Sequence, residues 1–280
     1  MDINIIFYTN CQSNGIMPNL QLNMKNITIH NIVNYHYIIN NIPLPIDIIS
    51  ICDIFIYQPI DKKHNIYSTE EDITNNIINF LPAKCVKIAF PYIYNSGIWG
   101  ITKDAIKNDD GSIQGNRDVI INLKSNGKTL PEVIQMYLNN EIDFNYKQRF
   151  ETSLLKLKEK EQKCDIHISE FIINNISKNK LFFTQNHPTP FMFKYVSHQI
   201  LDIIKTTFYN NVKNSEYVFV EHNSLCNGPI WPTSKSDLSY WKFDYITKSD
   251  ESADKYYIEL INRYYNLTIN NDEGQADVYY

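Results

Sequence analysis

The chain has 280 residues, 43% of them hydrophobic, and can therefore bury the core of one large domain or of one domain with a terminal extension. Its formal net charge of -5 excludes a broad nucleic-acid-binding face, which needs clustered basic residues, so we expect no nucleic-acid partner. Ile, Asn, Lys, Tyr and Phe dominate the composition, as A/T-rich codons dictate, and clusters of asparagine are accordingly weak evidence of function.

The start of the chain and its cysteines predict a soluble, cytoplasmic protein, in the host cytoplasm if the source is a virus. No basic segment precedes the short apolar run in "MDINIIF", so no signal peptide is expected, and no stretch approaches the roughly twenty apolar residues of a membrane span. The five cysteines, at 11, 52, 85, 164 and 226, are widely spaced, and neither they nor the histidines show a metal-ligand spacing. We therefore expect no disulfide framework and no metal.

Four short apolar runs predict strands in the first third of the chain. They are β-branched or aromatic, end at turn residues, and span residues 3–9, 27–33, 53–59 and 85–91. Ser68 and Glu71 form a capping-box pattern that predicts a helix between the last two. Strands that alternate with helices predict an α/β fold with a mostly parallel sheet flanked by helices, in which ligands bind at the carboxyl ends of the strands.

An irregular stretch from 92 to 116 follows, and a loop of this length in a compact domain is typically functional or mobile. Helical patterns come next, the second with Thr129 and Glu132 as a capping box, at residues 117–123, 129–140, 146–163 and 165–177. A strand over 181–183, a polar turn and a helix from Thr189 to about Thr206 complete a domain of residues 1–209. Residues 210–280, with a helix over 254–265, are predicted to form a C-terminal extension that covers the same domain.

The first candidate site is the polar turn that ends the first predicted strand, Asn10 to Ser13. At the carboxyl edge of the sheet, near the start of a helix, its backbone N–H groups point outward. This arrangement favours developing negative charge and lowers the pKa of the Cys11 thiol. The alternative is that Asn10 and Ser13 cap the turn and that Cys11 fills space in the core.

The second candidate is His187, which Pro188 restricts to extended backbone and which lies just before a predicted helix. The helix dipole disfavours imidazolium, so we expect a neutral ring that can accept a proton near neutral pH. Asn186 beside it can orient the ring or bind a substrate oxygen. The alternative is a histidine that only forms the turn.

Three further side chains are candidates for binding. The Gln58 amide ends the third strand, where it can donate to an oxyanion, hold a substrate hydroxyl or simply cap a loop carbonyl. Arg117 and Arg149 can each bind a phosphate bidentately, although a solvated surface arginine is the commoner outcome. The P-loop, the G-x-G-x-x-G pattern after the first strand and the G-x-S-x-G pattern are all absent from the sequence.

Four short motifs, taken in order, resemble the WcbI family of polysaccharide-biosynthesis proteins. They are "FYTNCQ" after the first strand, "DIFIYQP", "IAFPYIY" and "LFFTQNHPTP", and the resemblance runs from about residue 3 to 205. Thr9 replaces the glycine of the usual G-N-C-Q opening, whereas the N-H-P signature is intact at 186–188. We match no part of the family pattern to residues 210–280.

The resemblance implies an α/β enzyme that binds coenzyme A and acetylates a sugar during surface-glycan synthesis. Our leading hypothesis is transfer from acetyl-CoA to an amino sugar linked to a nucleotide, with His187 as the base. Backbone N–H groups around Cys11 and Gln12, with the amide of Gln12 or Gln58, would stabilise the oxyanion. Cys11 is either structural or accepts the acetyl group in a ping-pong mechanism.

The coenzyme also needs residues that bind its phosphates and its base. Arg117, Arg149 or nearby lysines would hold the phosphates. Tyr92, Tyr94 or Trp99 would stack on adenine or on the base of the nucleotide sugar.

Two alternative functions stay open. A hydrolase that resembles SGNH esterases or deacetylases would use the same base and the same turn, with water as the acceptor. A non-catalytic glycan-binding module would grip sugar with residues 92–99 and would leave His187 a structural role.

Overall fold

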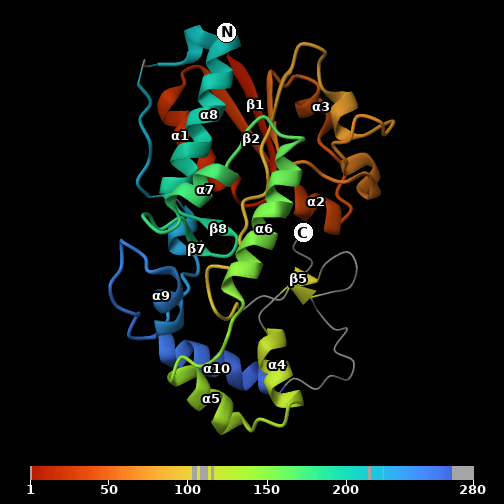
Figure 1. The fold of residues 1–280 in the computed structure, drawn as a ribbon. Helices are drawn as coiled ribbons and strands as arrows, with labels where there is room; N and C mark the ends of the chain where they lie inside the picture. The colour runs from red at the N-terminus through yellow and green to blue at the C-terminus, as the bar shows by residue number, and fades with distance from the viewer. Residues whose placement is uncertain are drawn as a thin grey trace.

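The structure is a computed structural model that describes residues 2–102, 106–107, 113–114, 117–213, 216–222 and 224–266 (Figure 1). Its centre is a four-stranded, all-parallel sheet in the order β2-β1-β3-β4. The strands are β1 (Ile3–Thr9), β2 (Ile27–Val33), β3 (Ile54–Tyr57) and β4 (Val86–Ala89). They confirm the four expected strands and the α/β class, with the third and fourth strands shorter than predicted.

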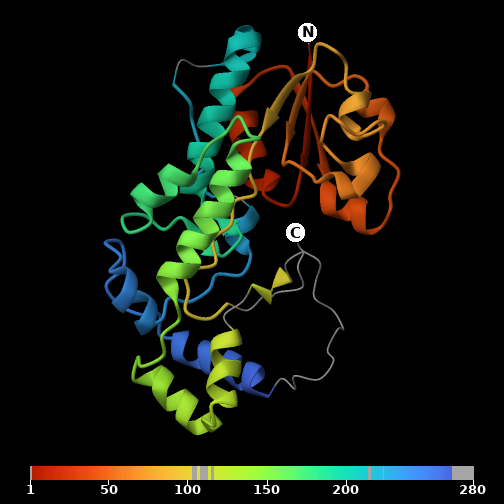
Figure 2. The same cartoon turned by 45° about the vertical axis from the view of Figure 1, so that its right-hand side comes forward.

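The central strand β1 is buried on both faces because a helical layer covers each side of the sheet. Its odd-numbered side chains pack with α1 (Ser13–Asn23) and α8 (Pro190–Phe208), and its even-numbered ones face α2 (Asn34–Ile39) and α3 (Ile46–Ile49). Figure 2 shows these layers on opposite sides of the strands. Where α1 meets α8, a Cβ on Gly15 would lie 2.3 Å from the Phe193 ring, so this contact requires glycine.

The connection between β3 and β4 differs from the helix expected at Ser68. It contains two short 3-10 helices, η1 (Lys62–Tyr67) and η2 (Ile77–Phe80), separated by turns. The Ser68 hydroxyl accepts a hydrogen bond from the backbone N–H of Glu70 and so closes a tight turn instead of capping a helix. Asn75, at a φ of 64°, interrupts any helix that would continue, and Asn76 caps η2.

A second group of helices lies at the end of the molecule opposite the sheet (Figure 1). It consists of α4 (Arg117–Ser125), α5 (Leu130–Leu138) and α10 (Ala253–Tyr265), which pack against one another. The helix α6 (Tyr146–Glu161) runs from this group towards the sheet. Its buried stripe is narrow, as expected, since Leu154 and Leu157 are buried whereas Leu155 is 60% exposed.

Two antiparallel pairs of very short strands lie outside the main sheet. They are β5 (Ile106–Lys107) with β6 (Ile113–Gln114), and β7 (Phe182–Thr184) with β8 (His187–Pro188). The strand expected at 181–183 therefore belongs to a hairpin that leads directly into α8. The remaining helices are α7 (Ser169–Asn175), α9 (Lys235–Trp241), η3 (Tyr209–Asn211) and η4 (Ser224–Asn227).

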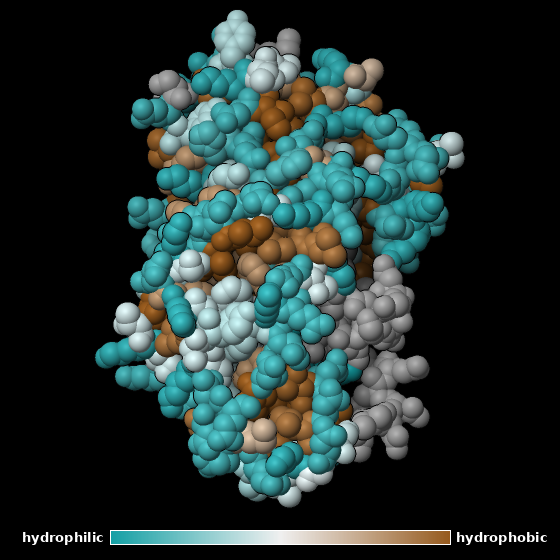
Figure 3. Space-filling model, viewed as in Figure 1, coloured by the Kyte–Doolittle hydropathy of each residue, from teal (hydrophilic) through white to brown (hydrophobic). Residues whose placement is uncertain are grey.

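The surface is largely hydrophilic on the face drawn in Figure 3, and its hydrophobic side chains gather in separate patches at the top, across the middle and at the bottom.

Within the described part of the chain, no helix combines the length and the apolar character needed to cross a membrane.

Candidate active site at the carboxyl edge of the sheet

The turn from Asn10 to Gln12 connects the carboxyl end of β1 to the first turn of α1. The backbone N–H of Asn10 donates to Oε1 of Gln58, at 3.0 Å, and so ties the end of β1 to the end of β3. The backbone N–H of Gln12 donates to Oδ1 of Asn10, at 2.9 Å. The turn is therefore fixed by side chains from two strands, at the edge where parallel sheets bind ligands.

The Gln12 side chain is fully buried and joins three further segments to this turn. Its Nε2 donates to the carbonyl of Ile93, at 2.8 Å, and to the carbonyl of Asn186, at 2.9 Å. Its Oε1 accepts from the backbone N–H of Ile93, at 3.1 Å, and from Nε2 of Gln58, at 2.9 Å. One amide thus holds together the ends of β1, β3 and β4 and the turn between β7 and β8.

These bonds bring together residues from three turns that the sequence analysis had treated separately, namely Asn10 and Gln12 on the first turn, Gln58 on the second and Asn186 on the third. They also correct the role expected for the Gln12 amide, because both of its N–H groups are already donated to carbonyls and none is left for an oxyanion. The Gln58 amide is committed in part, since it accepts from Asn10 and donates to Gln12. Both glutamines position the turn.

Cys11 is the half-buried residue at the tip of this turn. Burial raises the pKa of its thiol, although hydrogen bonding to its own backbone opposes the shift. The prediction that the helix dipole lowers the pKa of Cys11 is therefore wrong, because desolvation of the thiol has the larger effect on its pKa. Within the part of the chain that the structure describes, the backbone N–H of Cys11 forms a hydrogen bond only with its own thiol, and Nδ2 of Asn10 donates none.

Ser13 is the first residue of α1, and it is fully buried. Its hydroxyl lies 3.0 Å from Oδ1 of Asn31 in β2 and 3.2 Å from the carbonyl of Asn10. Because both neighbours are acceptors, Ser13 fastens the start of α1 to the edge strand, and its hydroxyl is not exposed to a ligand.

His187 reaches the same edge through the hairpin of β7 and β8. The carbonyl of its neighbour Asn186 accepts from Gln12, and the carbonyl of Gln185 accepts from the backbone N–H of Asn95, at 2.9 Å. Thr184 further fixes Asn186 by donating to its Oδ1, at 3.0 Å. His187 is half-buried, with its Nδ1 atom inside the protein, and α8 begins three residues later.

Tyr92 and Tyr94 lie in the segment after β4, beside the same hairpin. Their rings stack with centroids 5.9 Å apart, and Nζ of Lys160 lies 5.9 Å from the centre of the Tyr92 ring. The Tyr94 hydroxyl is 3.3 Å from Oε1 of Gln185. Both rings are only partly buried, so they present aromatic surface near the turn.

The structure places the other three expected binding residues elsewhere. Trp99 is 3% exposed and packs edge-on against Trp231, with the ring centroids 5.2 Å apart, so its ring cannot stack on a base. The Arg149 guanidinium donates to four backbone carbonyls, those of Ser96, Trp99, Gly100 and Phe144. These bonds hold a loop against α6. The guanidinium is therefore not available to bind a phosphate bidentately. Arg117 begins α4, far from the sheet in both views (Figures 1 and 2).

Asp237 is a buried residue that the sequence reasoning missed. Its Oδ1 accepts from the backbone N–H of Gly100 and from the Tyr146 hydroxyl, each at 2.7 Å, and its Oδ2 accepts from the N–H of Ser234, at 2.8 Å. Burial raises the pKa of this carboxyl, and these hydrogen bonds oppose the shift. The signal was present in the sequence, since Ser234 and Asp237 form the capping box of α9.

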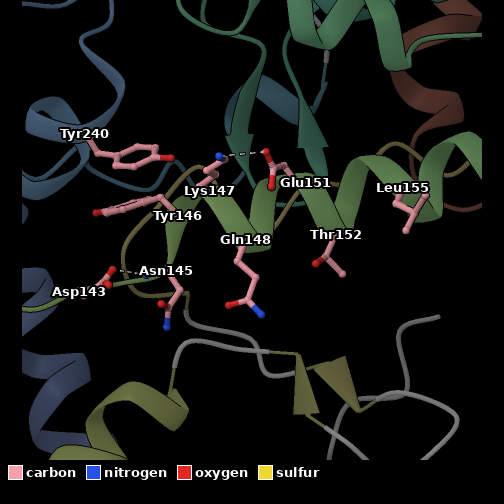
Figure 4. A pocket seen from close by; sticks show the side chains of 9 residues that line it. All are labelled: Asp143, Asn145, Tyr146, Lys147, Gln148, Glu151, Thr152, Leu155 and Tyr240. Carbon is pink, nitrogen blue, oxygen red and sulfur yellow. Dashed lines mark hydrogen bonds and ion pairs between the residues drawn. The ribbon is translucent and has the colours of Figure 1, made fainter.

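A hollow of about 620 Å³ runs along the outer face of α6 (Figure 4). The rings of Tyr146 and Tyr240 stack at one end, with centroids 4.7 Å apart. The rest of the lining is mainly polar, and the lining residues are Asp143, Asn145, Tyr146, Lys147, Gln148, Glu151, Thr152, Leu155 and Tyr240. The hydrogen bonds that join Gln12 to Gln58, Ile93 and Asn186, together with the bonds of Asn10, form what we call the Gln12 network. This hollow is separate from the Gln12 network, because none of its lining residues takes part in that network.

The described residues contain no group of three or more His, Cys, Asp or Glu side chains that could hold a metal ion. The fold and the polar turn at the carboxyl edge define an α/β protein with a candidate site for an anionic or carbonyl-bearing ligand at that edge.

A sequence model of the family described as "Polysaccharide biosynthesis enzyme WcbI" matches residues 4–207, and the chain belongs to this family. A solved structure of WcbI, described as a novel polysaccharide biosynthesis enzyme, is similar with a TM-score of 0.69 at 14% identity. The match covers 94% of this chain and 90% of that one, so the shared fold extends into residues 210–280, which the sequence motifs had not matched. The description of that structure names coenzyme A and a cysteine, without a disulfide bond between them. A comparison with curated proteins finds no match.

Proposed function

We propose that the protein transfers an acetyl group from acetyl-CoA to a sugar, an amino sugar linked to a nucleotide, during polysaccharide synthesis. The observation that carries this proposal is the fixed turn at Cys11, whose backbone N–H forms no hydrogen bond with any other described residue. Nδ2 of Asn10 is a second donor on the same turn. Two preorganised donors at a loop-built edge are what the tetrahedral oxyanion of acyl transfer requires.

His187 is the proposed base. As the acceptor amine attacks the thioester carbonyl, His187 takes a proton from the amine nitrogen and a C–N bond forms. The tetrahedral intermediate then collapses, the C–S bond breaks, and the proton passes from the imidazolium to the departing thiolate of coenzyme A. The bond from Gln12 to Asn186 supports this role, since it ties the residue beside His187 to the turn that carries the donors.

Direct transfer is the route that we favour over an acetyl-cysteine intermediate. The raised pKa of Cys11 leaves its thiol mostly protonated at neutral pH, and a thiol is a weaker nucleophile than a thiolate. In the ping-pong alternative, His187 would first have to deprotonate Cys11. The similar structure supports a coenzyme close to a cysteine, because its description names both.

The two substrates would contact different residues, and direct transfer requires the acceptor amine to reach the thioester at the Cys11 turn. Tyr92 and Tyr94 are proposed to stack on adenine or on the nucleotide base, since their rings are partly exposed beside the turn. The hollow along α6 is proposed to receive the sugar acceptor. Its stacked tyrosines suit the apolar face of a sugar ring, and its carboxylates and amides suit hydroxyls or an ammonium group better than phosphate (Figure 4).

We also propose that residues 210–280 are an extension packed on the same unit as residues 1–209. The hydrogen bonds that Asp237 accepts from Gly100 and Tyr146 support this organisation, because they join α9 to two segments of the first part of the chain.

The function is tested by incubating the protein with acetyl-CoA and a panel of nucleotide-linked amino sugars, followed by mass spectrometry of the sugars. We expect an added acetyl group on one class of sugar and release of coenzyme A only when that sugar is present. Release of free acetate without an acceptor would establish a hydrolase instead. Thermal stabilisation by glycans, with none by coenzyme A, would establish a glycan-binding module.

A further inference from the structure

The amino-terminal edge of the sheet, opposite the proposed site, carries two cysteines on neighbouring strands. Cys52 lies two residues before β3, and Cys85 directly precedes β4. These strands pair in parallel with Ile54 opposite Val86, and the N–H of Val86 donates to the carbonyl of Asp53, at 2.9 Å. Both cysteines pack into the same hydrophobic cluster, on the face covered by α2 and α3.

The two thiols interact directly but differ in environment. Cys52 is fully buried, and its Sγ lies 3.1 Å from the carbonyl oxygen of Ile54. Cys85 is only half-buried and can therefore be reached from solvent. Hydrogen bonding with the Cys52 thiol lowers the pKa of Cys85 and raises that of Cys52, whose burial adds to the rise. An accessible thiol with thiolate character beside a buried partner is the arrangement of a redox-active pair.

We propose that Cys52 and Cys85 form a reversible dithiol–disulfide site that takes a small hydroperoxide as its oxidant. This inference is independent of the proposed acetyl transfer, because neither cysteine takes part in the Gln12 network. It also differs from the disulfide framework that the spacing of the cysteines argued against, since it concerns a single pair.

The chemistry balances with one hydrogen peroxide for each disulfide. The Cys85 thiolate attacks one peroxide oxygen, the O–O bond breaks, and the hydroxide that leaves takes a proton to become water, which leaves a sulfenic acid on Cys85. Cys52 then attacks the Cys85 sulfur, the S–O bond breaks, and the proton of Cys52 goes to the second hydroxide. Two thiols and one peroxide thus give one disulfide and two waters.

The disulfide would close a loop from Cys52 to Cys85 that contains β3, η1 and η2. Cross-linking this loop restricts the unfolded chain, so we expect the oxidised protein to melt several degrees higher, roughly 5 °C or more. Two of the other cysteines serve as internal references. Burial raises the pKa of both Cys11 and Cys164, so they should react more slowly with peroxide than Cys85 does.

The test is to add one equivalent of hydrogen peroxide to the folded, reduced protein and to map its peptides by mass spectrometry without reduction. We expect a Cys52–Cys85 cross-linked peptide that is lost after dithiothreitol. With Cys85→Ser no cross-link can form, and with Cys52→Ser the sulfenic acid should persist on Cys85 and be trapped by dimedone. Circular dichroism checks that each variant is folded.

The proposal is overturned if Cys85 of the wild-type protein proceeds to sulfinic acid while Cys52 stays reduced, or if peroxide oxidises Cys11 or Cys164 first. A second probe does not depend on any variant. Dibromobimane becomes fluorescent when it bridges two close thiols, and we expect the bridge to join Cys52 and Cys85 in the native protein. A bridge between any other pair, or none, contradicts the proposed geometry.

Discussion

Two buried polar networks hold loops in place in this protein, one around Gln12 at the carboxyl edge of the sheet and one around Asp237 near α9. In both, a single side chain accepts or donates several hydrogen bonds across segments far apart in the sequence. The networks differ at their periphery. The Gln12 network ends in a turn with two donors that bind no other described residue, whereas the N–H of Gly100, the Tyr146 hydroxyl and the N–H of Ser234 all donate to the Asp237 carboxylate.

This difference distinguishes a network that only stabilises the fold from one that also prepares a binding site. A buried network whose members satisfy each other contributes stability and a defined geometry. A network that fixes a turn but leaves donors uncommitted prepares that turn for a ligand, since the cost of ordering the donors is met before the ligand arrives. Substitutions in the two networks should therefore affect stability in both cases and ligand binding in only one.

The largest loss of stability is expected for Asp237→Ala. Its removal leaves the N–H of Gly100, the Tyr146 hydroxyl and the N–H of Ser234 without their acceptor, at a cost of about 3–5 kcal/mol in the free energy of unfolding. Urea unfolding measures this cost. The matched control is Asp202→Ala on the exposed face of α8, which should cost less than about 1 kcal/mol. Equal effects of the two substitutions would show that the Asp237 network is not stabilising.

Gln12→Met tests the other network with a side chain of similar size. It leaves both Ile93 backbone groups, the carbonyl of Asn186 and one Gln58 donor unpaired, which should cost about 2–4 kcal/mol. It should also weaken binding of coenzyme A at a temperature where the variant is still folded, as measured by calorimetry. Unchanged affinity in the folded variant would contradict a role for this network in the site.

Arg149→Lys tests the correction made for this residue. A lysine cannot reproduce the planar fork that serves several carbonyls, so the variant should lose about 1–3 kcal/mol of stability. Its affinity for coenzyme A should stay within about twofold of the wild type, because Arg149 binds no phosphate in this account. A larger fall in affinity at unchanged stability would restore Arg149 as a phosphate ligand.

The smallest effect concerns the reactivity of Cys11. Because burial raises the pKa of this thiol, its thiolate fraction at pH 7 is below that of a free cysteine and grows as the pH rises towards that pKa. The rate of iodoacetamide labelling, followed by peptide mass spectrometry, should therefore rise about tenfold between pH 7 and pH 8. Cys85, whose pKa is lowered, should label faster at pH 7. A plateau below pH 8 for Cys11 would exclude the raised pKa.

The strands and the convergence of the turns could be predicted from the sequence. β-Branched runs bounded by turn residues marked β1 and β2 at their observed bounds, and the carboxyl ends of parallel strands share one edge of the sheet. This rule accounts for Asn10 and Gln58, at the ends of β1 and β3, but not for Asn186, which lies in an antiparallel hairpin outside the main sheet. The bonds of Gln12 could not be predicted, because they depend on the approach of a hairpin more than 170 residues away.

The wrong predictions for Trp99, Arg149 and Cys11 have a common physical cause, which is burial by segments distant in the sequence. Trp99 and Arg149 have the side chains of binding residues, but Trp231 covers the first and the carbonyls of a loop surround the second. The lowered pKa expected for Cys11 failed in the same way, since desolvation depends on tertiary packing. At Ser68 the capping-box pattern did not produce the expected helix. The Ser68 hydroxyl instead closes a tight turn with Glu70, and Asn75 has a positive φ.

The most direct test of the central claim is the rate of coenzyme A release from acetyl-CoA, with the acceptor sugar present, in the wild type, in His187→Ala and in a control, His198→Ala. His198 lies exposed on α8, where it pairs with Asp202, and its removal should change turnover by less than about twofold. Loss of the proposed base should lower turnover roughly 10²–10⁴-fold, with coenzyme A affinity and fold retained. A folded His187→Ala variant with the turnover of the wild type would contradict the account.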